Sequence, residues 1–113
     1  VPSYLVEIPN IIHEHYNQNM SLSALEMQFL VSRYRICREY TRFYGISPLK
    51  DQTLQRLNHA KTLLLIPDMN IQDISSQIGY ENVTHFIKLF KKYFQITPGA
   101  FRQTVLVSQS TLH

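Results

Sequence analysis

The sequence contains few of the residues that indicate a disulfide scaffold or a membrane protein. Cys37 is the only cysteine, so no internal disulfide can form, and a lone thiol fits a reducing cytoplasm. No apolar run approaches the ~20 residues that a membrane-spanning helix needs. The start of the chain lacks the basic flank and the small-residue cleavage site of a signal peptide. We therefore expect a cytoplasmic protein without a membrane segment.

Signals for β-structure are also missing. The chain has only 3 glycines, no Asn-Gly or Asp-Gly hairpin turn and no sustained period-two alternation. Apolar residues recur at helical spacing instead, which predicts an all-α fold of about seven helices. The predicted helices cover, in order, residues 9–17, 22–29, 33–44, 48–66, 71–78, 82–94 and 98–104.

Capping residues mark several of these helix ends. Ser21, Ser32 and Asn70 are suited to be N-caps, because their side-chain oxygens can accept hydrogen bonds from first-turn N–H groups. Gly45 and Gly79 can adopt the left-handed conformation that ends a helix. The long fourth helix is predicted to stop before residue 67, a proline.

The two ends of the chain have weaker patterns. Pro9 suits the first turn of a helix, so we expect the first helix to begin there. Residues 1–8 could extend that helix, but a proline inside it makes the continuous version less favourable. We expect residues 105–113 to form a fraying C-terminal tail. Because the chain begins with Val1 rather than Met, we also expect it to be a piece of a longer protein.

Basic residues are missing from residues 1–32, although the formal net charge of the chain is +3. They gather later in two clusters: Arg33, Arg35, Arg38 and Arg42, and then Lys88, Lys91 and Lys92. Two basic clusters separated by a nearly neutral segment suggest a polyanion that is contacted at two places. The alternative is a basic face that only meets solvent.

The two clusters belong to an internal repeat. A shift of 50 residues places Ile36 on Phe86 and Tyr40 on Phe90, and a shift of 49 places Leu25 on Ile74. The one-residue change falls in the turn between two helices of each unit. Each unit is thus a short helix, a tight turn and a longer basic helix. This is the helix-turn-helix layout, in which the second helix enters the DNA major groove.

Beside the apolar stripe of each basic helix runs a strip that mixes cations with apolar and hydroxyl side chains at i, i+3, i+4 and i+7. The strips are Tyr34, Cys37, Arg38 and Thr41 in the first unit, and Thr84, Ile87, Lys88 and Lys91 in the second. Such side chains can bond to base edges or pack against thymine methyls. The remaining cations, Arg33, Arg35, Arg42 and Lys92, suit phosphates. A different interpretation is that Ile87 and Cys37 belong to a wide buried stripe.

Residues that could catalyse reactions or bind metals are not arranged for either purpose. The 5 histidines have no cysteine or carboxylate partner at metal-ligand spacing. His13 and His15 lie on different faces of their predicted helix. A Gly-rich phosphate-binding loop is missing as well. We therefore predict no metal, no cofactor and no enzymatic activity.

These motifs resemble the AraC/XylS family of bacterial transcription regulators. The resemblance covers about residues 12–102 and is most specific in the second half. The family pattern has Arg-Leu-x-x-Ala, Ile-x-x-Ile-Ala, Gly-Phe, an aromatic-rich basic helix, Ser-Pro and a final Tyr/Phe-Arg. The matching residues here are Arg56, Leu57, Ala60 and the segment IQDISSQIGYENVTHFIKLFKKYFQITPGAFR, which ends in Phe101-Arg102.

The resemblance implies two helix-turn-helix subdomains, residues 1–46 and 67–104, joined by a linker helix of residues 47–66, with residues 105–113 as a tail. It implies sequence-specific binding of double-stranded DNA, with the two recognition helices in successive major grooves, and activation more than repression of transcription. The residues that it implies to read bases are Tyr34, Cys37, Arg38, Val83, Thr84 and Lys88. Thr41, Ile87 and Lys91 become secondary contacts.

Further partners follow from the resemblance. It implies contact with RNA polymerase, association with the nucleoid when DNA is bound, and a ligand-sensing or dimerising domain upstream in the full-length protein. A different function is a protein-interaction module whose basic helices dock on an acidic partner, such as a polymerase subunit. Salt dependence and sequence preference of DNA binding would distinguish the two.

Several residues depart from the family pattern, mostly in the first unit. They are Glu26 for Ala, Leu30 for Gly, Asp51, Gln52 and Gln55 for Tyr and apolar residues, Ser75 for Ala and Gln95 for Gly. We expect the first unit to be the less typical one, and the pattern leaves open whether it reads bases or only contacts phosphates.

Overall fold

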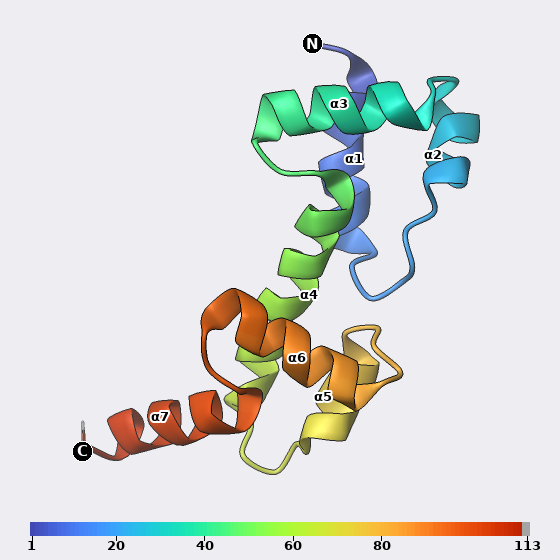
Figure 1. Cartoon of the computed structure of the whole chain (residues 1–113). Helices are drawn as coiled ribbons and strands as arrows, with labels where there is room; N and C mark the ends of the chain where they lie inside the picture. Colours follow the sequence, from blue (N-terminus) through green and yellow to red (C-terminus); the bar gives the residue numbers. More distant parts are fainter. Residues whose placement is uncertain (112–113) are drawn as a thin grey trace. The chain divides into compact units, whose positions relative to one another are not determined.

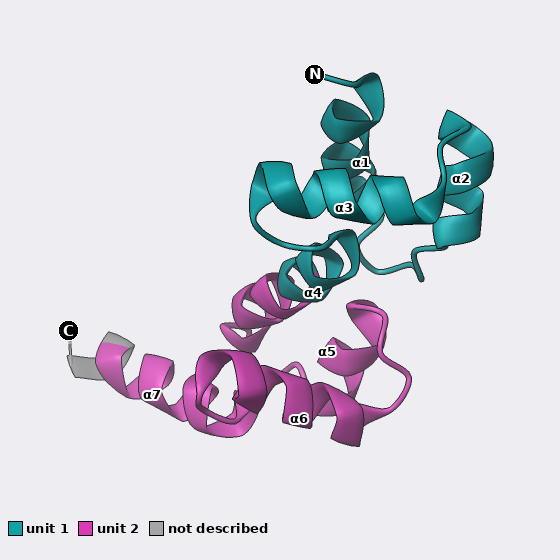
Figure 2. Cartoon of the chain, turned by 45° about the horizontal axis from the view of Figure 1, so that its top comes forward, with its two compact units in different colours: residues 1–55 teal, residues 56–113 magenta. Residues whose placement is uncertain are grey.

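The computed structural model describes the backbone of residues 1–111 and the side chains of residues 1–108. This part of the chain contains seven α-helices and no strand, so the all-α prediction is confirmed. The helices are α1 (Ser3–Glu14), α2 (Leu22–Phe29), α3 (Arg33–Tyr44), α4 (Pro48–Leu64), α5 (Ile71–Gln77), α6 (Val83–Phe94) and α7 (Pro98–Thr111) (Figure 1). They form two compact units, residues 1–55 and 56–113, and α4 contributes to both (Figure 2). None of the described helices is long and apolar enough to span a membrane.

The core of the first unit (unit 1) lies between α1, α2 and α3, and Figure 1 shows α3 crossing α1. Its buried residues are Tyr4, Leu5, Ile8, Ile12, Leu25, Ile36 and Tyr40. Each large apolar side chain that is removed from water contributes about 1.5–3 kcal/mol, so these faces fix the three helices against one another. Ser21 and Ser32 accept hydrogen bonds from the N–H groups of Ala24 and Arg35, which confirms both predicted N-caps.

The first helix begins at Ser3, so the prediction that it starts near Pro9 is wrong. Pro9 lies inside α1 and has no N–H to donate to the carbonyl of Leu5, four residues earlier. The Tyr44 hydroxyl of α3 donates to that carbonyl instead. The burial of Tyr4 and Leu5 also favours the longer helix, because both side chains join the core.

The second unit (unit 2) repeats this arrangement, with the second half of α4 in the place of α1. The buried residues of α4 have the spacing of the buried residues of α1: Arg56, Leu57, Ala60 and Leu64 match Tyr4, Leu5, Ile8 and Ile12 at a shift of 52 residues. α5 and α6 add Ile74, Ile78, Phe86 and Phe90 to the buried set. The repeat therefore includes the first helix of each unit, which the sequence analysis did not find.

Arg102 of α7 holds the end of α4 and the segment that follows it. Its guanidinium donates to the carbonyl oxygens of Leu64, Ile66 and Met69 at 3.0, 3.1 and 2.6 Å. The last carbonyls of a helix have no partner within the helix, and a charged donor makes strong hydrogen bonds to them. α4 ends before Pro67, as predicted.

The last helix is longer than the sequence analysis expected. α7 continues from Pro98 to Thr111, beyond Thr104, so residues 105–111 are helical rather than a fraying tail. Val105 and Leu106 are half-buried, which gives this extension an apolar side. The last two residues of the expected tail, 112 and 113, lie outside the described residues.

Three helices end on a residue in the left-handed conformation. Gly45 (φ 77°) does so as predicted, but Leu30 (φ 56°) and Gln95 (φ 62°) adopt the same conformation. A residue with a Cβ costs roughly 1 kcal/mol more there than glycine does. The family pattern has Gly at both of these positions, so the backbone here keeps a left-handed conformation that Leu and Gln disfavour.

Candidate nucleic-acid interface

The recognition helix of unit 1, α3, leaves one side exposed. Ile36 and Tyr40 are fully buried, whereas Tyr34 is 79% exposed. Arg38 and Thr41 are exposed as well, and Cys37 is half-buried. The strip that the sequence analysis described therefore lies at the surface of this unit, with Cys37 at its boundary with the core.

The recognition helix of unit 2, α6, has the same division. Phe86 and Phe90 are fully buried. Thr84, Lys88 and Lys91 are exposed, and Val83 and Ile87 are half-buried. Ile87 thus lies at the boundary between the buried stripe and the exposed strip. Each of the two interpretations, a residue of the exposed strip or of a wide buried stripe, describes part of its surface.

Two arginines that the sequence analysis assigned to phosphates make ion pairs within unit 1. Arg33 donates from Nε to Glu26 Oε1 and from Nη2 to Ser23 Oγ, both at 2.7 Å. Arg35 donates from Nε to Glu39 Oε1 at 3.0 Å. The hydrogen bond from Arg33 is the main cause that lowers the pKa of Glu26.

The sequence analysis missed both glutamates. Glu39 was detectable, because it follows Arg35 by four residues on one helix, a spacing at which opposite charges meet. Glu26 lies in a different helix from Arg33, so its only signal was its departure from the family pattern.

The other cations of the two strips are more accessible. Arg38, Arg42, Lys88, Lys91 and Lys92 are exposed. The ion pairs found among the described residues do not involve any of these five side chains. Within the described part of the chain, Lys88, Lys91 and Lys92 of unit 2 and Arg38 and Arg42 of unit 1 are thus cations without an ion pair.

Aromatic contacts fix α6 within unit 2. Its buried Phe90 meets Phe94 and Phe101 at ring-centroid distances of 4.8 and 5.8 Å. The Lys61 ammonium of α4 lies 3.7 Å from the ring centroid of Phe94, a cation–π contact. Asn82 caps the helix by accepting from the N–H of His85 at 3.1 Å.

Ser75, the residue that replaces the family's Ala, makes a hydrogen bond to the turn between α5 and α6. Ser75 is buried, and its hydroxyl donates to the carbonyl of Tyr80 at 2.7 Å. The guanidinium of the buried Arg56 lies 4.8 Å from the Tyr80 ring centroid. The buried hydroxyl that replaces a methyl group is thus satisfied by a hydrogen bond to the turn.

The polar residues at the start of α4 are satisfied within unit 1. The Tyr40 hydroxyl donates to Asp51 Oδ2 at 2.5 Å. Burial, together with this hydrogen bond, raises the pKa of Tyr40. The amide of the buried Gln52 donates to the carbonyl of Gln18.

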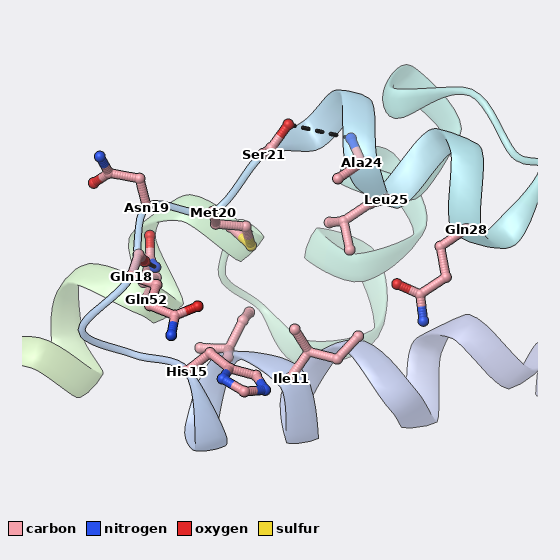
Figure 3. Close-up of a pocket in the computed structure, with 11 residues that line it drawn as sticks. Ile11, His15, Gln18, Asn19, Met20, Ser21, Ala24, Leu25, Gln28 and Gln52 are labelled. Carbon is pink, nitrogen blue, oxygen red and sulfur yellow. Dashed lines mark hydrogen bonds between the residues drawn. The ribbon is translucent and has the colours of Figure 1, made fainter.

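A cavity of about 190 Å³ opens beside Gln52, between α1, α2 and the loop that joins them (Figure 3). Ile11, Met20 and Leu25 give it an apolar lining, and His15 and Gln28 are among its polar groups. Asp, Glu, Lys and Arg are missing from the residues described around it. Gln52, which lines the cavity, is one of the three residues of α4 that stand where the family pattern has Tyr and apolar residues.

Comparisons with known proteins identify the family. A family model described as a helix-turn-helix domain matches residues 27–104. The uncharacterized HTH-type transcriptional regulator YdiP of Escherichia coli (strain K12) is 34% identical over 92 residues, which are 81% of this chain and 30% of that protein. The Msm operon regulatory protein of Streptococcus mutans is 29% identical over 104 residues, 91% of this chain and 37% of that protein. The chain thus spans about a third of the length of these relatives.

Solved structures show the same fold. The C-terminal domain of AraT, a response regulator from Geobacillus stearothermophilus, has a TM-score of 0.82 at 27% identity and is matched over 88% of this chain and 84% of its own. The DNA-binding domain of AdpA has a TM-score of 0.84 at 21% identity, over 94% and 96% of the two chains. The chain therefore belongs to the AraC/XylS family of transcription regulators, of which it forms the helix-turn-helix DNA-binding part.

Proposed function

We propose that this chain binds double-stranded DNA sequence-specifically through α3 and α6 and thereby regulates bacterial transcription, by activation more than by repression. The observation that carries the proposal is the matched pair of strips. Two helices related by the repeat each bury an apolar stripe and expose cations beside hydroxyl or aromatic side chains. The AdpA domain, whose fold this chain shares, was solved in complex with a target DNA, which supports the proposal.

The strips, the cations beside them and the resemblance to the family suggest a role for each residue. The proposed base-reading residues are Tyr34, Cys37, Arg38, Val83, Thr84 and Lys88, because cations and hydroxyls can bond to base edges and the apolar members can pack on thymine methyls. The proposed phosphate or secondary contacts are Arg33, Arg35, Thr41, Arg42, Ile87, Lys91 and Lys92. Each recognition helix is proposed to enter a major groove, and the two grooves are successive.

Further partners belong to the same proposal. The relatives are about three times as long as this chain, which supports an additional ligand-sensing or dimerising domain in the full-length protein. RNA polymerase is the proposed protein partner once DNA is bound. The proposed location, in keeping with a duplex partner, is the bacterial cytoplasm, at the nucleoid. These proposals rest on the likeness to regulators rather than on the geometry of the site.

Selection from random duplexes, followed by sequencing, tests the proposal and identifies the preferred site. Lys88→Ala is then expected to change the preference at one or two base pairs, at a cost of ~1–3 kcal/mol for the preferred duplex. Lys92→Ala is the matched control on the same helix, and it is expected to weaken all duplexes alike. Equal weakening of every sequence by both variants would show that Lys88 does not read bases. Failure to enrich any sequence would contradict the proposed function.

A further inference from the structure

The starting observation is the way in which α2 holds Arg33, the first residue of α3. The guanidinium donates to Glu26 Oε1 and Ser23 Oγ, both at 2.7 Å and both on α2. The side chains of Arg33 and Glu26 are only 41% and 32% exposed. Two short hydrogen bonds from a neighbouring helix restrict the guanidinium more strongly than a single exposed ion pair does.

Unit 2 shows that this pair is not a requirement of the helix-turn-helix arrangement. At the shifts that define the repeat, Arg33 corresponds to Val83 and Glu26 to Ser75. Neither of these residues can form an ion pair, yet unit 2 has the same succession of helices. The ion pair is therefore an addition specific to unit 1.

We propose that Glu26 acts as an intramolecular substitute for a DNA phosphate: it holds Arg33 in a neutral pair, so that unit 1 contributes less charge to duplex binding than its arginines indicate. The inference rests on the proposed function and revises the role given above to Arg33. A cation that already faces a carboxylate releases few counterions when DNA arrives, and the carboxylate itself repels nearby phosphates.

The second ion pair of α3 carries less weight. Arg35 makes one hydrogen bond to Glu39 at 3.0 Å within the same helix, and its side chain is 55% exposed. An exposed i,i+4 pair of this kind contributes little and is readily exchanged for another anion. Glu26 is therefore the carboxylate on which the proposal depends.

The experiment measures the affinity of the whole 113-residue chain for a mixed-sequence duplex of about 30 base pairs, as a function of salt concentration. Glu26→Ala introduces the residue of the family pattern. It is expected to steepen the log–log salt slope by about 1 and to raise affinity at ~0.1 M salt on the order of fivefold. Arg33→Ala is expected to leave the slope unchanged when Glu26 is present, and to reduce it by about 1 in the Glu26→Ala background.

Matched variants separate the possible outcomes. Glu7→Ala removes the same charge from an exposed position on α1, and an effect equal to that of Glu26→Ala would show that only net charge matters. If Glu26→Ala lowers helix content, Glu26→Gln repeats the test with the side-chain shape preserved. A slope reduced by about 1 in Arg33→Ala alone would show that Arg33 already contacts phosphate, and would overturn the inference while leaving the proposed function intact. Salt-independent binding, or none, by the unaltered chain would overturn both.

Discussion

The hydrogen bond between Tyr44 and Leu5 allows a quantitative test of how α1 tolerates an internal proline. Pro9 leaves the Leu5 carbonyl without its helical donor, and the Tyr44 hydroxyl takes that place. Tyr44→Phe keeps the ring and removes only the donor. Because an unsatisfied buried carbonyl costs ~1–3 kcal/mol and Tyr44 is 40% exposed, we expect unit 1 to lose about 1 kcal/mol of unfolding free energy.

The same reasoning predicts the effect of removing the proline. Proline in a helix interior is ~3 kcal/mol less favourable than alanine, and the more flexible unfolded chain of the variant offsets ~0.4–1 kcal/mol of that. Pro9→Ala should therefore stabilise unit 1 by about 2 kcal/mol. Its new N–H can donate to Leu5, so Tyr44→Phe should cost about 0.5 kcal/mol or less in the Pro9→Ala background.

Urea unfolding followed by circular dichroism gives the four free energies of this double-mutant cycle. Hydrogen exchange of the α1 amides assigns the changes to unit 1. If Tyr44→Phe has the same cost in both backgrounds, the hydroxyl does not compensate for Pro9, and the explanation of the long first helix is wrong.

Three other predictions concern stability. Arg102→Lys keeps the charge, but a lysine cannot donate to the three carbonyls at once. The free energy of unfolding of unit 2 should therefore fall by about 2 kcal/mol. An unchanged midpoint in urea would contradict this capping role. Leu30→Gly relieves the left-handed conformation and should stabilise unit 1 by up to ~1 kcal/mol in thermal unfolding, whereas a loss would show that the exposed Leu30 side chain stabilises the turn. Burial and Asp51 raise the pKa of Tyr40 above its usual value near 10, so the folded state holds this proton more tightly than the unfolded chain does. The stabilisation that the protonated Tyr40 hydroxyl contributes is complete below about pH 10 and is lost as pH rises through the folded pKa. Tyr40→Phe should therefore flatten the decrease in Tm at alkaline pH. An unchanged decrease would contradict the assignment to Tyr40.

Local chemistry explains which parts of the fold were predictable from sequence. The N-caps Ser21, Ser32 and Asn70 accept hydrogen bonds from residues three positions later, so the information lies within one helical turn. The strips on α3 and α6 were predictable for the same reason, since helical spacing alone separates Tyr34 and Lys88 from the buried stripe.

The error at the start of the first helix arose because a distant part of the chain changes a local preference. Pro9 locally favours a helix start, and only a hydroxyl from another helix makes the longer α1 possible. The role of Arg33 as a phosphate contact stays a prediction, but sequence reasoning did not find its ion pair with Glu26 of α2. Tyr44 and Leu5 are 39 residues apart, and Glu26 lies in a different helix from Arg33, so helical spacing could not have indicated either contact.

In both units a side-chain contact joins the first helix to the end of the basic helix, but the residues that make this contact differ. At a shift of 52 residues Pro9 corresponds to Lys61, and at a shift of 50 Tyr44 corresponds to Phe94. In unit 1 the Tyr44 hydroxyl bonds to a carbonyl that Pro9 frees, whereas in unit 2 the Lys61 ammonium lies over the Phe94 ring. Both contacts connect the first helix of a unit to the end of its recognition helix.

The two units also differ in how their surface charges are connected to their packing. In unit 1 the ion pair of Arg33 joins α3 to α2, so a substitution there changes both the packing of two helices and the charge offered to a polyanion. In unit 2, Lys88 and Lys91 are exposed, and no ion pair among the described residues involves them. Their replacement should therefore change charge with little effect on the fold. It follows that Lys88 and Lys91 can vary with little effect on the stability of unit 2, whereas Arg33 cannot vary without affecting the packing of unit 1.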